Sequence, residues 1–236
     1  MLREASEHLT HRKLRLLACG DFRRFLPESG DAAGPYVAAA EMLADGELHP
    51  EAIHTLPLDP DSLQMRFPYL RKATMCLVWR DTTRLQLWET EGDAAWAARR
   101  LHDSAVDNAN RVLCLLNAFA VSERSLAAGP VDSTPQQLRW AEYARRTREW
   151  ATQVEIIRDI FGNPFRPVPF APSWRTTTAV AVVRQMYDTR DFAAMPVLAD
   201  ALQEAGCDSN DILAHCRGPG PHVRGCWVVD LVLGKA

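Results

Sequence analysis

The chain has 236 residues, 47% of them hydrophobic and 24% charged, and a formal net charge of −3. These values are typical of a globular protein that buries a sizeable core, and the charge argues against nucleic acid or an anionic membrane as the main partner. The longest apolar run, residues 112–121, is interrupted by Asn117, so no membrane span is expected. The first fifteen residues lack the apolar stretch of a secretory signal. We therefore expect a cytoplasmic protein whose six cysteines are reduced.

Apolar residues recur at helical spacing along most of the chain, and strand signals are scarce. Proline, glycine and capping residues divide this pattern into segments. The predicted helices cover residues 11–26, 35–44, 68–89, 93–124, 134–161, 174–188, 196–205, 208–215 and 221–233.

The predicted fold class is all-α, an irregular bundle of about nine helices. Residues 162–174 carry four prolines, which exclude a helix there and predict an extended strap. Its aromatic residues favour packing on the body of the protein over a solvated linker. We expect one domain over residues 1–236. It has a possible subdivision into a bundle (1–161) and a short-helix cap (174–236), joined by the strap at 162–173.

The predicted helix over residues 134–161 interleaves arginines with aromatic residues, a combination that suits single-stranded nucleic acid. We prefer a structural interpretation, in which helical spacing puts the aromatic side chains in the core and glutamates offset the charge. The residues concerned are Arg139, Arg145, Arg146, Arg148, Trp140, Tyr143 and Trp150. The expected apolar stripe of this helix is Leu138, Tyr143, Trp150, Val154, Ile157 and Phe161.

Near the C-terminus the chain reads HCRGPGPHVRGCW, residues 215–227. His222 and Cys226 are four apart on the predicted last helix and would project from one face, a spacing that suits two ligands of one zinc ion. His215 and Cys216 precede the turn, and one or both would complete the set. Cys207 lies about 13 Å further along the preceding predicted helix, too far to share the ion.

Three other interpretations of this motif remain open. The preferred one is a corner between helices, with buried thiols and histidines bonded to the backbone. An anion could bind at the start of the last helix, although prolines remove backbone donors there. A cysteine paired with a histidine is also a possible nucleophile.

A second candidate is the dipeptide His102-Asp103. Metal-dependent phosphohydrolases of the HD type use such a pair together with another histidine and aspartate. The dipeptide occurs often by chance, so a solvated helix face is the preferred interpretation.

Five stretches carry a resemblance to a known family: RDIFGNPFRPV (158–168), QMYD (185–188), LADALQEAGCD (198–208), HCRGPGPHVRGCWVVDLVLGK (215–235) and, near the N-terminus, RKLRLLAC (12–19). The chain resembles a bacterial protein family that has these signatures and no assigned activity. Members often continue the N-terminal stretch with two further cysteines, where this chain has Asp21 and Phe22. The resemblance implies a bacterial cytosolic origin and supplies no reaction.

No catalytic motif dominates, so the leading hypothesis is a non-enzymatic interaction or regulatory module whose partner is another protein. The alternative is a zinc protein, with an open coordination position making it a metal-dependent hydrolase. In that alternative His215, Cys216, His222 and Cys226 are the candidate ligands and zinc is the cofactor. Under the leading hypothesis of an interaction module, no cofactor is expected. The sequence leaves enzymatic activity and oligomeric state open.

Overall fold

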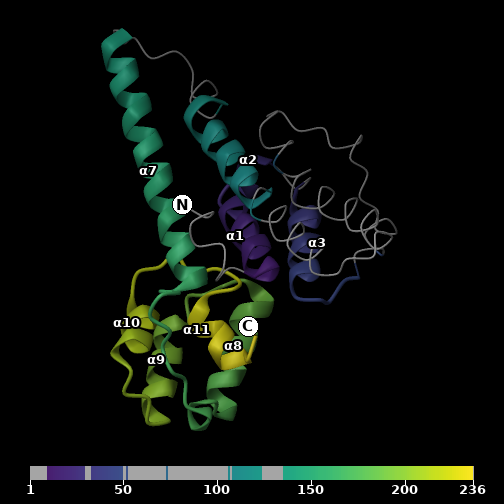
Figure 1. Cartoon of the computed structure of the whole chain (residues 1–236), viewed down its shortest axis with the longest axis vertical. Coiled ribbons are helices and arrows are strands. Elements are labelled where there is room, and N and C mark those ends of the chain that lie inside the picture. The colour runs from purple at the N-terminus through teal and green to yellow at the C-terminus, as the bar shows by residue number, and fades with distance from the viewer. Residues whose placement is uncertain are drawn as a thin grey trace. The chain divides into compact units, whose positions relative to one another are not determined.

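The computed structural model describes residues 10–29, 33–49, 52, 73, 106, 108–123 and 135–235 (Figure 1). All regular structure within these ranges is helical, which confirms the predicted all-α class. Eight α-helices have assigned bounds there, close to the nine expected. The predicted helix over 68–89 lies outside the described residues except for Ala73, which is helical and buried. No helix in the described part of the chain is long and apolar enough to cross a membrane.

The helices follow one another in the order shown in Figure 1. A helical stretch at 108–118 leads into a π-helical turn, Phe119–Glu123. The α-helices are α1 His11–Arg23, α2 Leu26–Ser29, α3 Gly34–Ala44, α7 Pro135–Phe161, α8 Thr177–Thr189, α9 Met195–Glu204, α10 Asn210–Arg217 and α11 Trp227–Leu233.

The chain forms two compact units, Met1–Gln153 and Val154–Ala236. The division falls inside α7, earlier than the strap at 162–173 where the sequence placed a subdivision. The last turns of α7 belong to the C-terminal unit, and Asp159 in these turns bonds to residues 215–223. That the two units fold as one domain over 1–236 stays a prediction.

The N-terminal unit is built on α1 and α3, which pack against each other. Thr10 caps α1 by accepting a hydrogen bond from the Lys13 N–H. Leu14, Leu17 and Phe22 of α1 are completely buried, as the helical spacing predicts. α1 ends at Arg23, three residues earlier than expected, and a turn leads into the short helix α2.

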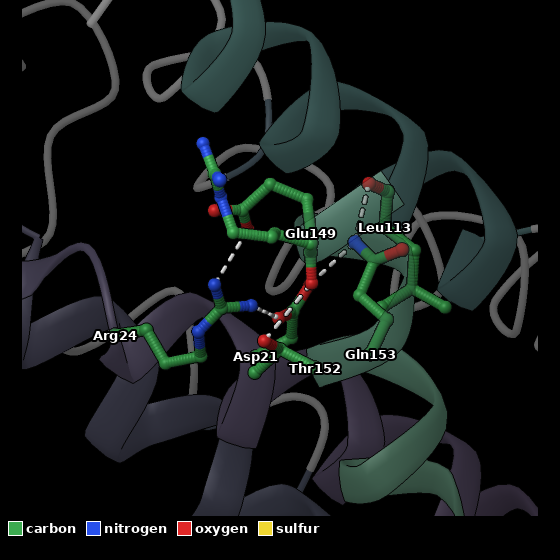
Figure 2. Close-up of polar contacts among 7 residues, drawn as sticks. Asp21, Arg24, Leu113, Glu149, Thr152 and Gln153 are labelled. Atoms are coloured by element: carbon green, nitrogen blue, oxygen red, sulfur yellow. Dashed lines mark hydrogen bonds and ion pairs between the residues drawn. The ribbon is translucent and has the colours of Figure 1, made fainter. Parts of the chain in front are cut away.

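A buried polar network joins α1 to α7 within this unit (Figure 2). Arg24 donates to the carboxylates of Asp21 and Glu149. The Gln153 amide nitrogen donates to Asp21 at 2.9 Å and to the Leu113 carbonyl at 3.0 Å. Burial raises the pKa of Asp21, although Arg24 and Gln153 act to lower it.

The C-terminal unit gathers α8 to α11 around one apolar core (Figure 1). α8 packs on α9 and α11, α9 packs on α10, and α10 contacts α11. Thr176 caps α8 by accepting from the Ala179 N–H, so the helix begins three residues later than expected. Residues 172–174 form a 3-10 turn instead.

The apolar stripe predicted for α7 is wrong. Its fully buried apolar side chains are Ile156 and Ile160, whereas Trp140, Tyr143 and Trp150 are 63%, 63% and 54% exposed. At 100° per residue these three aromatic residues lie about 100–180° around the helix from Glu149, the residue that turns to the polar network. The face of α7 that packs carries Glu149 and Gln153 of the polar network together with the buried Ile156 and Ile160.

The strap after α7 is extended, as its prolines require. Val168, Phe170 and Trp174 pack against the C-terminal core, as expected for a strap on the body. Phe165 does not: it sits in a turn closed by the Arg166 N–H and the Asn163 carbonyl and is 74% exposed.

Candidate metal centre

Asp159 lies in the last turn of α7 and is almost completely buried. Its Oδ2 accepts the Val223 N–H at 2.9 Å, and its Oδ1 lies 2.7 Å from His222 Nδ1 and 3.2 Å from His215 Nε2. A carboxylate at a helix C-terminus faces the negative end of the helix dipole. This position therefore favours a cation beside Asp159.

His222 and Cys226 lie on an irregular segment between α10 and α11, not on the predicted last helix. α11 begins only at Trp227. Gly225 has φ +96°, a left-handed conformation that cannot continue a right-handed helix, and the Cys226 N–H closes a turn onto the Val223 carbonyl. The expectation of a shared helix face was wrong, although both residues reach the same point.

Adjacent residues of α10 diverge, so His215 and Cys216 have different surroundings. His215 Nε2 faces Asp159 and lies 3.2 Å from Cys226 Sγ. Cys216 is completely buried in the apolar core, where burial raises the pKa of its thiol to about 12. Of the two candidates that precede the turn, only His215 joins the cluster.

Four donor groups converge at this point, from Asp159, His215, His222 and Cys226. One ligand atom from each can be chosen so that all four lie within 4.8 Å of one another. Three of these residues are among the four predicted ligands. Asp159 replaces Cys216, and Cys207 stays outside the group as expected.

The charges of the cluster also suit a cation. Burial acts to raise the pKa of Asp159, but hydrogen bonds from His215, His222 and the Val223 N–H outweigh it, so the pKa is lowered and the carboxylate is charged. Burial raises the pKa of Cys226 well above its ordinary value. Without a metal ion, burial thus favours the neutral thiol. A metal ion bound to the sulfur would favour the thiolate instead, because the thiolate is the form that binds metal.

The same geometry argues against a cysteine–histidine nucleophile. A catalytic histidine uses one ring nitrogen for the nucleophile and the other for the orienting carboxylate. Here the single Nε2 of His215 faces both Cys226 and Asp159. The Cys226 side chain is also completely buried, where no substrate reaches it.

The sequence analysis named two other candidate sites, an anion site at the turn and the dipeptide His102-Asp103. The Val223 N–H, which could have met an external anion, is used by Asp159. His102 and Asp103 lie outside the described residues.

Asp159 was missed because it lies 56 residues before His215 in sequence. A signal was present: an acidic residue in the last turn of a helix, three residues before the C-terminal glycine Gly162, opposes the helix dipole. Searching for such unfavourable charges would have selected it.

No protein-family pattern, curated protein or solved structure matches this chain. The resemblance to a bacterial family stays a prediction, and the case for function rests on the cluster itself.

Proposed function

We propose that the C-terminal unit is a zinc-binding module in which Asp159, His215, His222 and Cys226 hold one ion. The supporting observation is the convergence of four donor groups within 4.8 Å in the described part of the chain. Ligand distances of about 2.0–2.3 Å around tetrahedral zinc separate the donor atoms by about 3.3–3.7 Å. The 2.7 Å and 3.2 Å contacts would expand to reach those values, and a pair as far apart as the 4.8 Å limit would close by about 1 Å.

Charge balance and ligand number support a structural zinc ion. One thiolate and one carboxylate neutralise Zn²⁺, so the buried centre would carry no net charge. Four protein ligands complete the tetrahedron, whereas catalytic zinc keeps one position for water. The proposal therefore favours a non-enzymatic module over a hydrolase, and the zinc would tie the end of α7 to the corner between α10 and α11.

Elemental analysis of protein purified without a metal-affinity tag tests this proposal. We expect about one equivalent of zinc per chain in the wild type, and loss of the ion in Asp159→Asn and Cys226→Ser. Cys216→Ala is the matched control, because it removes a buried thiol next to a ligand yet should retain zinc. Absence of metal from the wild type, or loss of zinc only in the Cys216 variant, would contradict the assignment.

A second candidate function, protein interaction, is favoured by the exposed aromatic stripe of α7, defined as Trp140, Tyr143 and Trp150. Arg139 and Arg146 flank the stripe and are exposed, and Glu142 pairs with Arg146. In an antiparallel pair of two copies, the flank that carries Arg139 and Arg146 would face its own copy. The Trp140 and Tyr143 rings meet edge to face at 89°, which offers no parallel platform for stacked bases. We propose an amphipathic helix with acidic flanks, from another protein, as the partner.

Two designed helical peptides test the stripe: both carry the same leucine face, with glutamate flanks in one and lysine flanks in the other. We expect the acidic peptide to bind at least about tenfold more tightly, with binding lost in Trp140→Ala/Tyr143→Ala. Gln136→Ala, at an exposed position of the same helix, is the control. Equal binding of both peptides, or self-association through the stripe, would contradict the proposal.

We propose the cytoplasm of a bacterium as the location. The five described cysteines, Cys19, Cys114, Cys207, Cys216 and Cys226, are not joined in disulfides, as a reducing compartment favours.

A further inference from the structure

Trp227 lies beside the candidate metal centre without belonging to it. Its ring centroid is 5.1 Å from that of His215, with the two planes inclined at 54°. It directly follows Cys226 and is the first residue of α11. One side chain thus connects the start of α11 to a ligand on α10.

The end of α7 holds the same indole ring. Gly162 follows the last residue of α7 with φ +59°, and its N–H bonds to the Arg158 carbonyl at 2.9 Å. A Cβ built on Gly162 would lie 3.1 Å from Trp227 Cγ, closer than ordinary packing allows. The glycine therefore ends the helix and leaves room for the indole.

His215 is the ligand that most needs such support. Its side chain is 20% exposed, compared with 9% for His222 and 2% for Asp159, and Cys226 is completely buried. A partly exposed imidazole on the last turn of a short helix has rotamer freedom that binding must remove. Packing against a fixed indole removes that freedom before the metal arrives.

We infer that Trp227 is a positioning residue that holds the His215 imidazole in its ligating orientation, with Gly162 providing the space for the indole. This inference rests on the zinc site proposed above. It predicts that zinc affinity depends on the aromatic ring at position 227 and is separable from the overall stability of the C-terminal core.

Competition with a chromophoric zinc chelator measures this dependence. We expect Trp227→Leu to weaken zinc binding about 10–100-fold and Trp227→Phe to recover most of the loss, since a planar ring still contacts His215. Val232→Ala is the matched control, because it truncates a buried side chain of the same helix. It should lower thermal stability while changing zinc affinity less than about threefold. Equal affinity losses in Trp227→Leu and Val232→Ala, or none in either, would overturn the inference.

A second measurement separates this inference from the zinc proposal. In metal-free protein, long-range ¹H–¹⁵N spectra report the tautomer and environment of each imidazole. Trp227→Leu should move the His215 signals toward those of a free histidine. The signals of His222, whose ring contacts His215 but which is held by Asp159 at 2.7 Å, should move less. Unchanged His215 signals would overturn the positioning role. Failure of the wild type to bind zinc would overturn the zinc proposal and with it the ligating role, whereas the metal-free spectra would still show whether Trp227 orients the His215 imidazole.

Discussion

At the scale of single residues, Asp159 carries the most information. It is buried, it lies where the helix dipole opposes a negative charge, and each of its carboxylate oxygens has a partner. An asparagine would avoid the unfavourable charge and keep the shape. A cation shared with His215, His222 and Cys226 gives a physical reason for the charged residue.

The cysteines allow a prediction of reactivity. Cys114 is exposed, whereas Cys216 is completely buried with its pKa raised to about 12 from 9.0. The higher pKa alone makes the Cys216 thiolate fraction at neutral pH about a thousandfold smaller. N-ethylmaleimide should therefore modify Cys114 in the native protein and Cys216 only after unfolding, as mapped by peptide mass spectrometry.

Cys114→Ser provides the control for this labelling. It should abolish the modification at position 114 in the native protein and leave the modification of Cys216, which requires unfolding, unchanged. Labelling of Cys216 at the rate of Cys114 in folded protein would contradict the burial of α10 against the core.

At the scale of elements, the polar network between α1 and α7 depends on Arg24. Its side chain is 24% exposed and bonds to the carboxylates of Asp21 and Glu149, so its removal leaves two poorly solvated acids. We expect Arg24→Met to lower the free energy of unfolding by about 2–4 kcal/mol at neutral pH, measured by urea denaturation. Adding Asp21→Asn should restore part of the loss. If the double variant is less stable than Arg24→Met, this account of the network is wrong.

The same variant has a predicted pH dependence. Burial raises the pKa of Asp21 in the folded state, so its ionisation costs stability as pH rises through that pKa. Arg24 acts to lower the pKa of Asp21, so in Arg24→Met the pKa of Asp21 in the folded state rises further. The destabilisation by Arg24→Met should therefore be largest at neutral pH and shrink as pH falls toward about 4, the ordinary range of aspartate. A destabilisation that grows on acidification would contradict the sign.

The start of α8 gives a second prediction for an element. Thr176 accepts the Ala179 N–H at 3.2 Å, and the next residue, Thr177, is an exposed threonine outside the cap position. Thr176→Ala should destabilise the protein by about 1 kcal/mol, whereas Thr177→Ala should change stability by less than about 0.5 kcal/mol. Thermal unfolding of the pair measures the difference. Equal effects of the two substitutions would show that the Thr176 cap does not determine where α8 begins.

At the scale of the whole molecule, the zinc proposal and the two compact units together predict a local response to chelation. All four ligands belong to the unit Val154–Ala236. Removing the metal should speed amide hydrogen exchange in α10, α11 and the segment between them, and leave α1 and α3 within about twofold of their former rates. Equal acceleration in both units would instead support one cooperative domain over 1–236.

Much of the fold follows from local patterns. The helical class, the bounds of α3 and α7, the extended strap and the buried face of α1 all depend on spacing, caps and prolines within a few residues. The start of α11 was missed because Gly225 adopts a left-handed conformation. The exposed stripe of α7 was missed because the packed face carries the polar Glu149 and Gln153 as well as Ile156 and Ile160, so hydrophobic spacing alone does not single it out.

By itself the sequence determined that the protein is helical, where most of the described helices lie, and that His215, His222 and Cys226 belong to one candidate site. These results depend on interactions between near neighbours in the chain. Only the tertiary structure decided that Asp159 joins the site and that Cys216 leaves it for the core. Metal ligands converge through the packing of helix ends, and that packing depends on contacts between residues far apart in the chain.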